Sequence, residues 1–276
     1  MVSRKVIQEE EEDGQVTAVD MEDHNQPMNV IENKTVLENR TSSQFYEKGF
    51  MISADETEND DDDDSQDAFD DIEDEETLCG EVTNETRKKV FPSAVIIGTK
   101  KEGTRALLEF LNMHSLVRRS KHETHFYDKN YAKGTAWYVE QMPEIFAGQI
   151  SLEKTPGYFH TPGVPQRIFS TQNSTKLILI VRNPVTRLIS DYNQFRSNTL
   201  ARNMTYPPLE ELVTTQAGAV SEQYPPVQRS MYHKHMKSWL SIFPRQQIMV
   251  VDGDNFIQQP WAEQGRVEKF LDLPHH

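Results

Sequence analysis

The chain has 276 residues and a formal net charge of −15, but this charge averages two unlike parts. Residues 1–86 hold 28 acidic and 5 basic side chains, whereas residues 87–276 hold 16 acidic and 24 basic ones. Neither part has an apolar run near the ~20 residues of a membrane-spanning helix, so we expect no transmembrane segment. The only cysteine, Cys79, excludes an intrachain disulfide and argues against a structural zinc site.

Residues 1–86 carry a net charge of −23 and few large apolar side chains. Uninterrupted acidic runs occupy residues 9–13 and residues 60–64. Such a composition buries too little apolar surface to offset the entropy of the chain, so we predict an acidic disordered region. This region acts either as a solvating spacer or as an intramolecular competitor for a basic surface.

Residues 87–276 form the second predicted domain, with a net charge of +8 and enough length for one hydrophobic core. Its positive charge implies an anionic partner: a nucleotide, a nucleic acid, a membrane surface or an acidic polysaccharide. No signal-peptide pattern follows Met1, which favours the cytosol, whereas five N-x-[ST] sequons favour a secretory compartment. The sequons begin at Asn33, Asn39, Asn84, Asn173 and Asn203.

The first predicted element of this domain is an apolar strand at residues 94–97, which leads through a glycine-containing loop into a helix. Free N–H groups at the N-terminus of such a helix bind phosphate. The spacing of Gly98 and Gly103 matches G-x-x-x-x-G-K-[ST], but Thr104 and Arg105 replace the lysine and the magnesium-binding hydroxyl. A loop without a magnesium ligand suits a phosphosulfate donor and disfavours a nucleotide kinase. A glycine-bearing turn with no ligand is the remaining alternative.

The rest of the domain alternates between strand and helix patterns. Strand-like runs occur at residues 94–97, 149–153, 176–181 and 248–251, and helical patterns occur at residues 104–113, 131–141, from Pro184 onward, 231–243 and 261–271. Residues 176–181 are apolar on both faces, as in an interior parallel strand. This alternation predicts an α/β fold with a parallel sheet flanked by helices.

A second anion site is predicted after the strand at residues 176–181. Arg182 directly follows this strand, and Ser190 lies two turns into the next helix. Open α/β sheets bind ligands at the carboxyl ends of their strands, and an arginine with a hydroxyl forms a good phosphate receptor. Two anion sites indicate a nucleotide with both 3′ and 5′ phosphates. Alternatively, Arg182 forms a surface ion pair and Ser190 is a small buried helix residue.

Five segments together resemble the heparan sulfate glucosamine 3-O-sulfotransferases, namely residues 98–111, 123–128, 131–138, 153–159 and 182–192. The resemblance runs from about residue 91 to residue 274. It implies a P-loop-like sulfotransferase fold and a metal-independent transfer of a sulfuryl group from 3′-phosphoadenosine 5′-phosphosulfate (PAPS) to the 3-hydroxyl of glucosamine in heparan sulfate. It also implies heparan sulfate or heparin, and no nucleic acid, as the partner, and a glycoprotein of the Golgi lumen.

The resemblance also implies a role for individual residues. Glu123 matches the general base that takes the hydroxyl proton, Lys101 stabilises the leaving phosphate oxygen, and His125 orients the base or the sugar. The 5′-phosphosulfate is assigned to Lys101, Gly103, Thr104 and Arg105, and the 3′-phosphate is assigned to Arg182 and Ser190. The polysaccharide is assigned to Lys100, Asp128, Lys154 and Gln194, and no residue is assigned to a metal.

The sequence departs from the family in three ways. Glu102 stands where a glycine is usual, and it weakens donor binding unless its side chain points to solvent or pairs with Lys100. Thr124 replaces the usual proline after the base and loosens the backbone there. Family members also continue beyond the position of His276 with a loop that closes over the donor, so we expect little transfer by this chain alone. The alternative function is a catalytically impaired protein of the same fold that binds nucleotide or heparan sulfate.

Overall fold

The structure is a computed structural model that describes residues 86–274. The predicted acidic region except residue 86, together with Cys79 and the sequons at Asn33, Asn39 and Asn84, lies outside this range. The boundary between residues 86 and 87 therefore stays a prediction. Across the described range, no helix is both long and apolar enough to cross a membrane.

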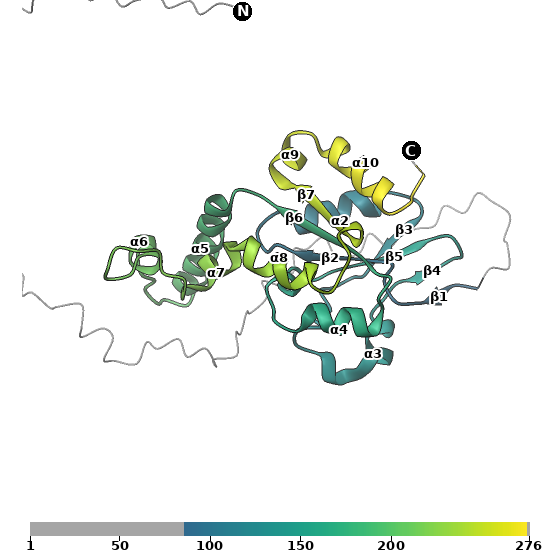
Figure 1. Cartoon of the computed structure of the whole chain (residues 1–276), viewed down its shortest axis with the longest axis horizontal. Helices are drawn as coiled ribbons and strands as arrows, with labels where there is room; N and C mark the ends of the chain where they lie inside the picture. Colours follow the sequence, from purple (N-terminus) through teal and green to yellow (C-terminus); the bar gives the residue numbers. More distant parts are fainter. Residues whose placement is uncertain (1–85, 275–276) are drawn as a thin grey trace, which may run out of the picture. The chain divides into compact units, whose positions relative to one another are not determined.

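A five-stranded parallel sheet forms the centre of the fold, in the order β3-β5-β2-β6-β7 (Figure 1). The strands are β2 (Ala94–Gly98), β3 (Val117–Arg119), β5 (Ile150–Lys154), β6 (Lys176–Val181) and β7 (Ile248–Asp252). In the middle of the sheet, Ile96 pairs with Lys154 on one side and with Ile178 on the other. The predicted parallel sheet is confirmed, and β3 is the strand that the sequence pattern did not indicate.

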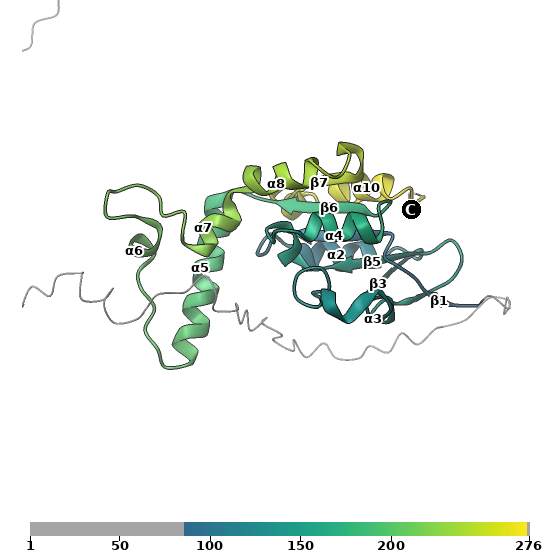
Figure 2. The ribbon, with the colours of Figure 1, turned by 60° about the horizontal axis from the view of Figure 1, so that its bottom comes forward.

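Helices cover both faces of this sheet (Figures 1 and 2). One face carries α2 (Thr104–Asn112), α9 (Gly253–Gln258) and α10 (Pro260–Phe270), and the other carries α3 (Gly134–Glu140), α4 (Val164–Thr171) and α8 (Tyr232–Leu240). Because side chains of a strand alternate between faces, Ile96 packs in the core under α2 whereas Ile97 packs in the core with Trp239 of α8.

A second group of helices extends to one side of the sheet, as Figure 2 shows. It contains α5 (Pro184–Ala201), α6 (Leu209–Val213) and α7 (Pro225–Ser230). Helix α5 begins as predicted, with Pro184 at its first position and the Asn183 side chain accepting bonds from the Val185 and Thr186 N–H groups.

The remaining elements are short. Strands β1 (Lys88–Lys89) and β4 (Glu144–Ile145) form an antiparallel pair, and the 3₁₀ turns are η1 (Tyr131–Lys133), η2 (Pro156–Phe159) and η3 (Arg245–Gln247). The helix predicted at residues 131–141 is thus a 3₁₀ turn followed by the short helix α3.

Candidate active site

The predicted site residues gather at the carboxyl edge of the sheet, on the segments that follow β2, β3, β5 and β6. Lys154 is the last residue of β5, Arg182 follows β6, and Glu123 lies in the loop after β3. In a parallel sheet these segments share one edge, which is where open α/β sheets bind ligands. Residues as far apart in the sequence as Lys101 and Gln194, 93 positions, are therefore brought to one side of the fold.

The loop after β2 is shaped to present backbone N–H groups. Gly103 has φ +91°, a left-handed conformation that favours glycine, and it directly precedes α2. The first N–H groups of α2 have no partner within the helix, as at any helix N-terminus. Thr104 is buried at the start of the helix, and Arg105 is exposed beside it. The loop thus has the geometry of an anion site.

Lys101 of this loop contacts Gln194, a residue to which the resemblance assigns a different role. Lys101 donates a hydrogen bond from Nζ to Oε1 of Gln194 at 3.1 Å, and Gln194 lies on α5. Lys100 is half-buried in the same loop. The contact places a residue that the resemblance assigns to the donor against a residue that it assigns to the polysaccharide.

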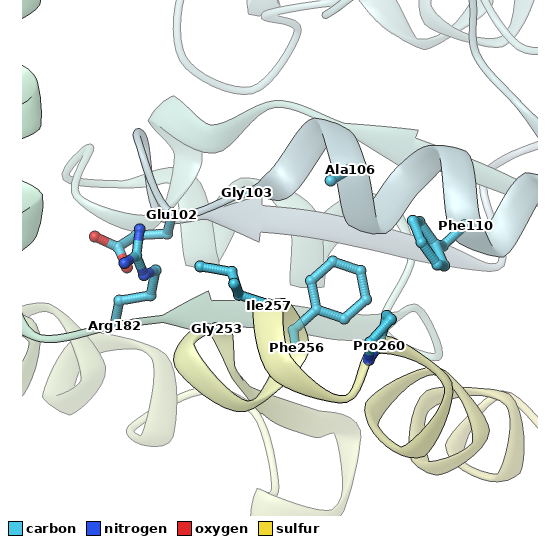
Figure 3. A pocket seen from close by; sticks show the side chains of 9 residues that line it. All are labelled: Glu102, Gly103, Ala106, Phe110, Arg182, Gly253, Phe256, Ile257 and Pro260. Atoms are coloured by element: carbon cyan, nitrogen blue, oxygen red, sulfur yellow. The ribbon is translucent and has the colours of Figure 1, made fainter.

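Arg182 lies at one end of a pocket of about 240 Å³ between α2 and α9 (Figure 3). Its Nε donates to Oδ1 of Asp254 at 2.8 Å, and this hydrogen bond lowers the pKa of Asp254. Gly253 allows this arrangement, because a Cβ there would lie 2.4 Å from Cγ of Arg182. Ser190 is half-buried on α5 and does not line this pocket. Arg182 and the loop after β2 therefore line the same pocket, whereas Ser190 lies outside it.

Glu102 also lines this pocket, so its side chain does not point to solvent, which was one of the two conditions under which it would leave donor binding unaffected. Glu102 is 1% exposed, and the hydroxyl of Tyr232 donates to its Oε1 at 3.4 Å. Burial raises the pKa of Glu102 to about 7, although the charges of Arg182 and Arg187 lower it. The carboxyl of Glu102 is therefore close to half-ionised near neutral pH.

A compact charged cluster surrounds the predicted base. Lys154 forms an ion pair and hydrogen bond with Oε1 of Glu123, while Nε2 of His125 lies 3.5 Å from Oε2 of Glu123. On its other side, Nδ1 of His125 is 2.8 Å from Oδ2 of Asp128. Four residues that the sequence singled out are thus assembled, with His125 between two carboxylates.

This cluster keeps Glu123 ionised. Burial alone raises the pKa of Glu123, but the hydrogen bond from His125 and the charge of Lys154 lower it more, so that the pKa lies below its ordinary value. A polar pocket of about 200 Å³ adjoins Glu123 and is also lined by Asn130 and Trp137. An ionised carboxylate beside such a pocket is placed to accept a proton from a bound hydroxyl.

A buried hydrogen-bond network supports the loop that carries Glu123. Glu153 on β5 is fully buried and accepts hydrogen bonds from the hydroxyls of Thr155, Thr124 and Tyr138. The Tyr158 hydroxyl in turn accepts from the Phe126 N–H at 2.9 Å. Glu153 was not among the predicted site residues, although it ends the strand-like run at residues 149–153 and begins the family-resembling segment at residues 153–159. Thr124, read as loosening the backbone, is instead an anchor of this network.

The described residues thus form a parallel sheet flanked by helices, with a glycine-containing loop after β2 and an arginine after the neighbouring strand β6. A sulfotransferase of known structure from Alicyclobacillus acidocaldarius shares this fold, with a TM-score of 0.54 at 19% identity over 67% of this chain and 82% of that one. Residues 91–276 match the sulfotransferase domain family. The chain belongs to this family.

The relatives with similar sequences carry names that specify a substrate, which the family description does not. The chain is 47% identical over 187 residues to heparan sulfate glucosamine 3-O-sulfotransferase 5 of Mus musculus and of Homo sapiens, covering 67% of this chain and 54% of each relative. It is 46% identical over 187 residues to heparan sulfate glucosamine 3-O-sulfotransferase 3B1 of Homo sapiens, covering 47% of that relative. The chain thus spans about half the length of the curated relatives it matches.

Proposed function

We propose that this protein transfers a sulfuryl group from PAPS to the 3-hydroxyl of a glucosamine in heparan sulfate, without a metal. The observation that carries the proposal is the ionised Glu123, held by Lys154 and His125 beside an open polar pocket. The sequence identity of 46–47% between this chain and the heparan sulfate glucosamine 3-O-sulfotransferases supports the proposed class of substrate.

The donor residues follow from the loop geometry. PAPS supplies a sulfuryl group bound to a phosphate leaving group. The N–H groups at the start of α2, with Lys101, Thr104 and Arg105, suit its 5′ end, because they offer donors and positive charge in one place. Arg182 suits a 3′-phosphate, and Ser190 is kept as its proposed partner. Among the described residues that line the pocket, Glu102 is the only acidic one, and its buried carboxylate opposes an anion.

The transfer step assigns one task to each group. The sugar hydroxyl oxygen forms a bond to sulfur while its proton passes to a carboxylate oxygen of Glu123. The bond between sulfur and the phosphate oxygen breaks, and its electron pair stays on that oxygen, where Lys101 stabilises the charge. Asp128 holds His125, and His125 orients Glu123. Lys100, Lys154 and Gln194 bind the acidic groups of the polysaccharide.

Replacement of the base tests this proposal. We expect Glu123→Gln to lower labelled sulfate transfer from PAPS to heparan sulfate about 10²–10⁴-fold, because an amide cannot take the proton. Binding of adenosine 3′,5′-bisphosphate should be unchanged. A second form, extended with the C-terminal segment of a relative, is assayed in parallel, since the chain spans about half the length of the relatives it matches.

The matched control is Glu144→Gln, which removes an exposed carboxylate on β4. It should transfer sulfate at the rate of the unchanged protein, in buffer without added magnesium. Equal transfer by the Glu123→Gln and unchanged proteins would remove Glu123 from the chemistry. Nucleotide and heparan sulfate binding with no transfer by either form would instead favour the impaired binding protein.

Location in the Golgi lumen and glycosylation belong to the same proposal. Of the five sequons, those at Asn173 and Asn203 lie within the described range, and both asparagines are exposed. Both sites meet the accessibility that a glycan requires, and a mass shift on treatment with an N-glycosidase would test them.

A further inference from the structure

Glu102 places a buried carboxylate inside a loop whose other features favour anions. Its side chain is 1% exposed, although it directly precedes the glycine at the start of α2. Lys100 and Lys101 come immediately before it in the chain. The N–H groups of the next helical turn lack partners within the helix. A carboxylate in this position opposes the anion-binding character that the proposed donor requires.

Groups from two other elements face this carboxylate. The hydroxyl of Tyr232, at the start of α8, donates to Oε1 at 3.4 Å. Figure 3 shows the guanidinium of Arg182 beside Glu102 at the same end of the pocket. Oε2 of Glu102 is buried and has no hydrogen-bond partner among residues 86–274. The pocket thus holds an unsatisfied acceptor next to the arginine assigned to the 3′-phosphate.

Burial and the surrounding charges together allow both the protonated and the ionised form of Glu102 near neutral pH. The groups that act on it from other elements are Arg182 after β6, Arg187 on α5, Tyr232 on α8 and Asp254 on α9. Arg182 and Arg187 favour the ionised form, whereas Asp254 disfavours it. Burial is the largest influence and raises the pKa to about 7. A ligand that interacts differently with the two forms will therefore shift the balance between them.

We propose that Glu102 sets the affinity of the donor pocket, because its ionised carboxylate competes with a ligand phosphate for Arg182 and its protonated form does not. The inference rests on the proposed function. An ionised carboxylate that is itself buried repels a phosphate bound close to it more strongly than two solvated charges would repel each other. The protonated carboxyl carries no charge and offers an O–H to a phosphate oxygen. Binding of a 3′-phosphate is therefore coupled to proton uptake by Glu102.

Calorimetry with adenosine 3′,5′-bisphosphate tests this coupling at pH 6, 7 and 8 in two buffers of different ionisation enthalpy. The unchanged full chain is compared with Glu102→Gln, which has the same shape and no charge. At pH 8 we expect the Gln variant to bind about tenfold more tightly, because the unchanged protein must first gain a proton one pH unit above its pKa. At pH 6 the two proteins should bind about equally. At pH 8 the unchanged protein should also take up close to one proton more per bound nucleotide than the Glu102→Gln variant does.

Two further variants keep the test decisive. Glu102→Gly removes the side chain altogether and should also lose the pH-dependent penalty, which covers the case in which the Gln variant does not fold. Glu144→Gln, which changes an exposed side chain on β4, should follow the unchanged protein at every pH. A ratio of affinities that stays constant from pH 6 to pH 8 would overturn the competition while leaving the donor site standing. Absence of nucleotide binding by every form at every pH would overturn the donor site and the inference together.

Discussion

At the scale of single residues, three carboxyl groups at this edge of the sheet differ because their surroundings differ. Glu123 is paired with Lys154 and faces His125, which holds its pKa below the ordinary value. Burial raises the pKa of Glu102 and of Glu153 to about 7. Groups whose environments separate their pKa values in this way take different roles. Glu123 is thus the group suited to accept a proton at neutral pH, while Glu153 positions the loop beside it.

The 3′-phosphate assignment makes a prediction about nucleotide selectivity. We expect Arg182→Ala to weaken binding of adenosine 3′,5′-bisphosphate by roughly 1.5–3 kcal/mol, because a hydrogen bond to a charged group is lost. Binding of adenosine 5′-phosphate should be nearly unchanged, since it lacks the phosphate that Arg182 contacts. Calorimetry measures both. Arg196→Ala, which removes an exposed arginine from α5, is the control. Equal losses for the two nucleotides would show that Arg182 does not read the 3′-phosphate.

At the scale of elements, the strands were predictable where burial leaves a pattern in the sequence. Strand β6 is apolar on both faces, and the position of Pro184 marked the start of α5. Strand β3 has three residues, two of them arginines, so nothing in its composition distinguished it from a loop. Motif spacing located the anion loop, and family resemblance supplied Glu123. The burial of Glu102 and the network around Glu153 depend on packing between distant segments, which local sequence does not encode.

One buried acidic residue links helices α5 and α7 beside the sheet. Asp191 on α5 is 1% exposed and receives hydrogen bonds from Arg187 at 2.9 Å and from Arg229 of α7 at 3.4 Å. We expect Asp191→Ala to lower the free energy of unfolding by about 3–5 kcal/mol, because two buried arginines lose their counter-charge. Denaturant unfolding followed by circular dichroism measures the change.

The control is Glu210→Ala, which removes an exposed carboxylate from α6 and should change stability by less than about 0.5 kcal/mol. A cost for Asp191→Ala as small as that of this control would mean that other groups neutralise the two arginines.

At the scale of the whole molecule, charge is distributed unevenly along the chain. Residues 1–86 carry −23 and residues 87–276 carry +8. We expect deletion of residues 1–86 to raise affinity for heparin, most clearly at low salt, because a tethered polyanion competes at high effective concentration. Heparin-column elution at several salt concentrations measures this effect. Changing the five aspartates at residues 60–64 to asparagine should give part of the gain. Unchanged elution after the deletion would identify the acidic region as a spacer.

The strand order has a consequence for the synthesis of the protein. The central strand β2 is made first, but its partners β5 and β6 begin only at Ile150 and Lys176. At a translation rate of about 5–20 residues per second, β2 is complete roughly 3–10 seconds before the first residue of a partner strand is added. During that interval an apolar strand with two unpaired edges is open to association with other chains. The arrangement that places β2 at the centre of the sheet therefore leaves both of its edges unpaired in the nascent chain until β5 has been made.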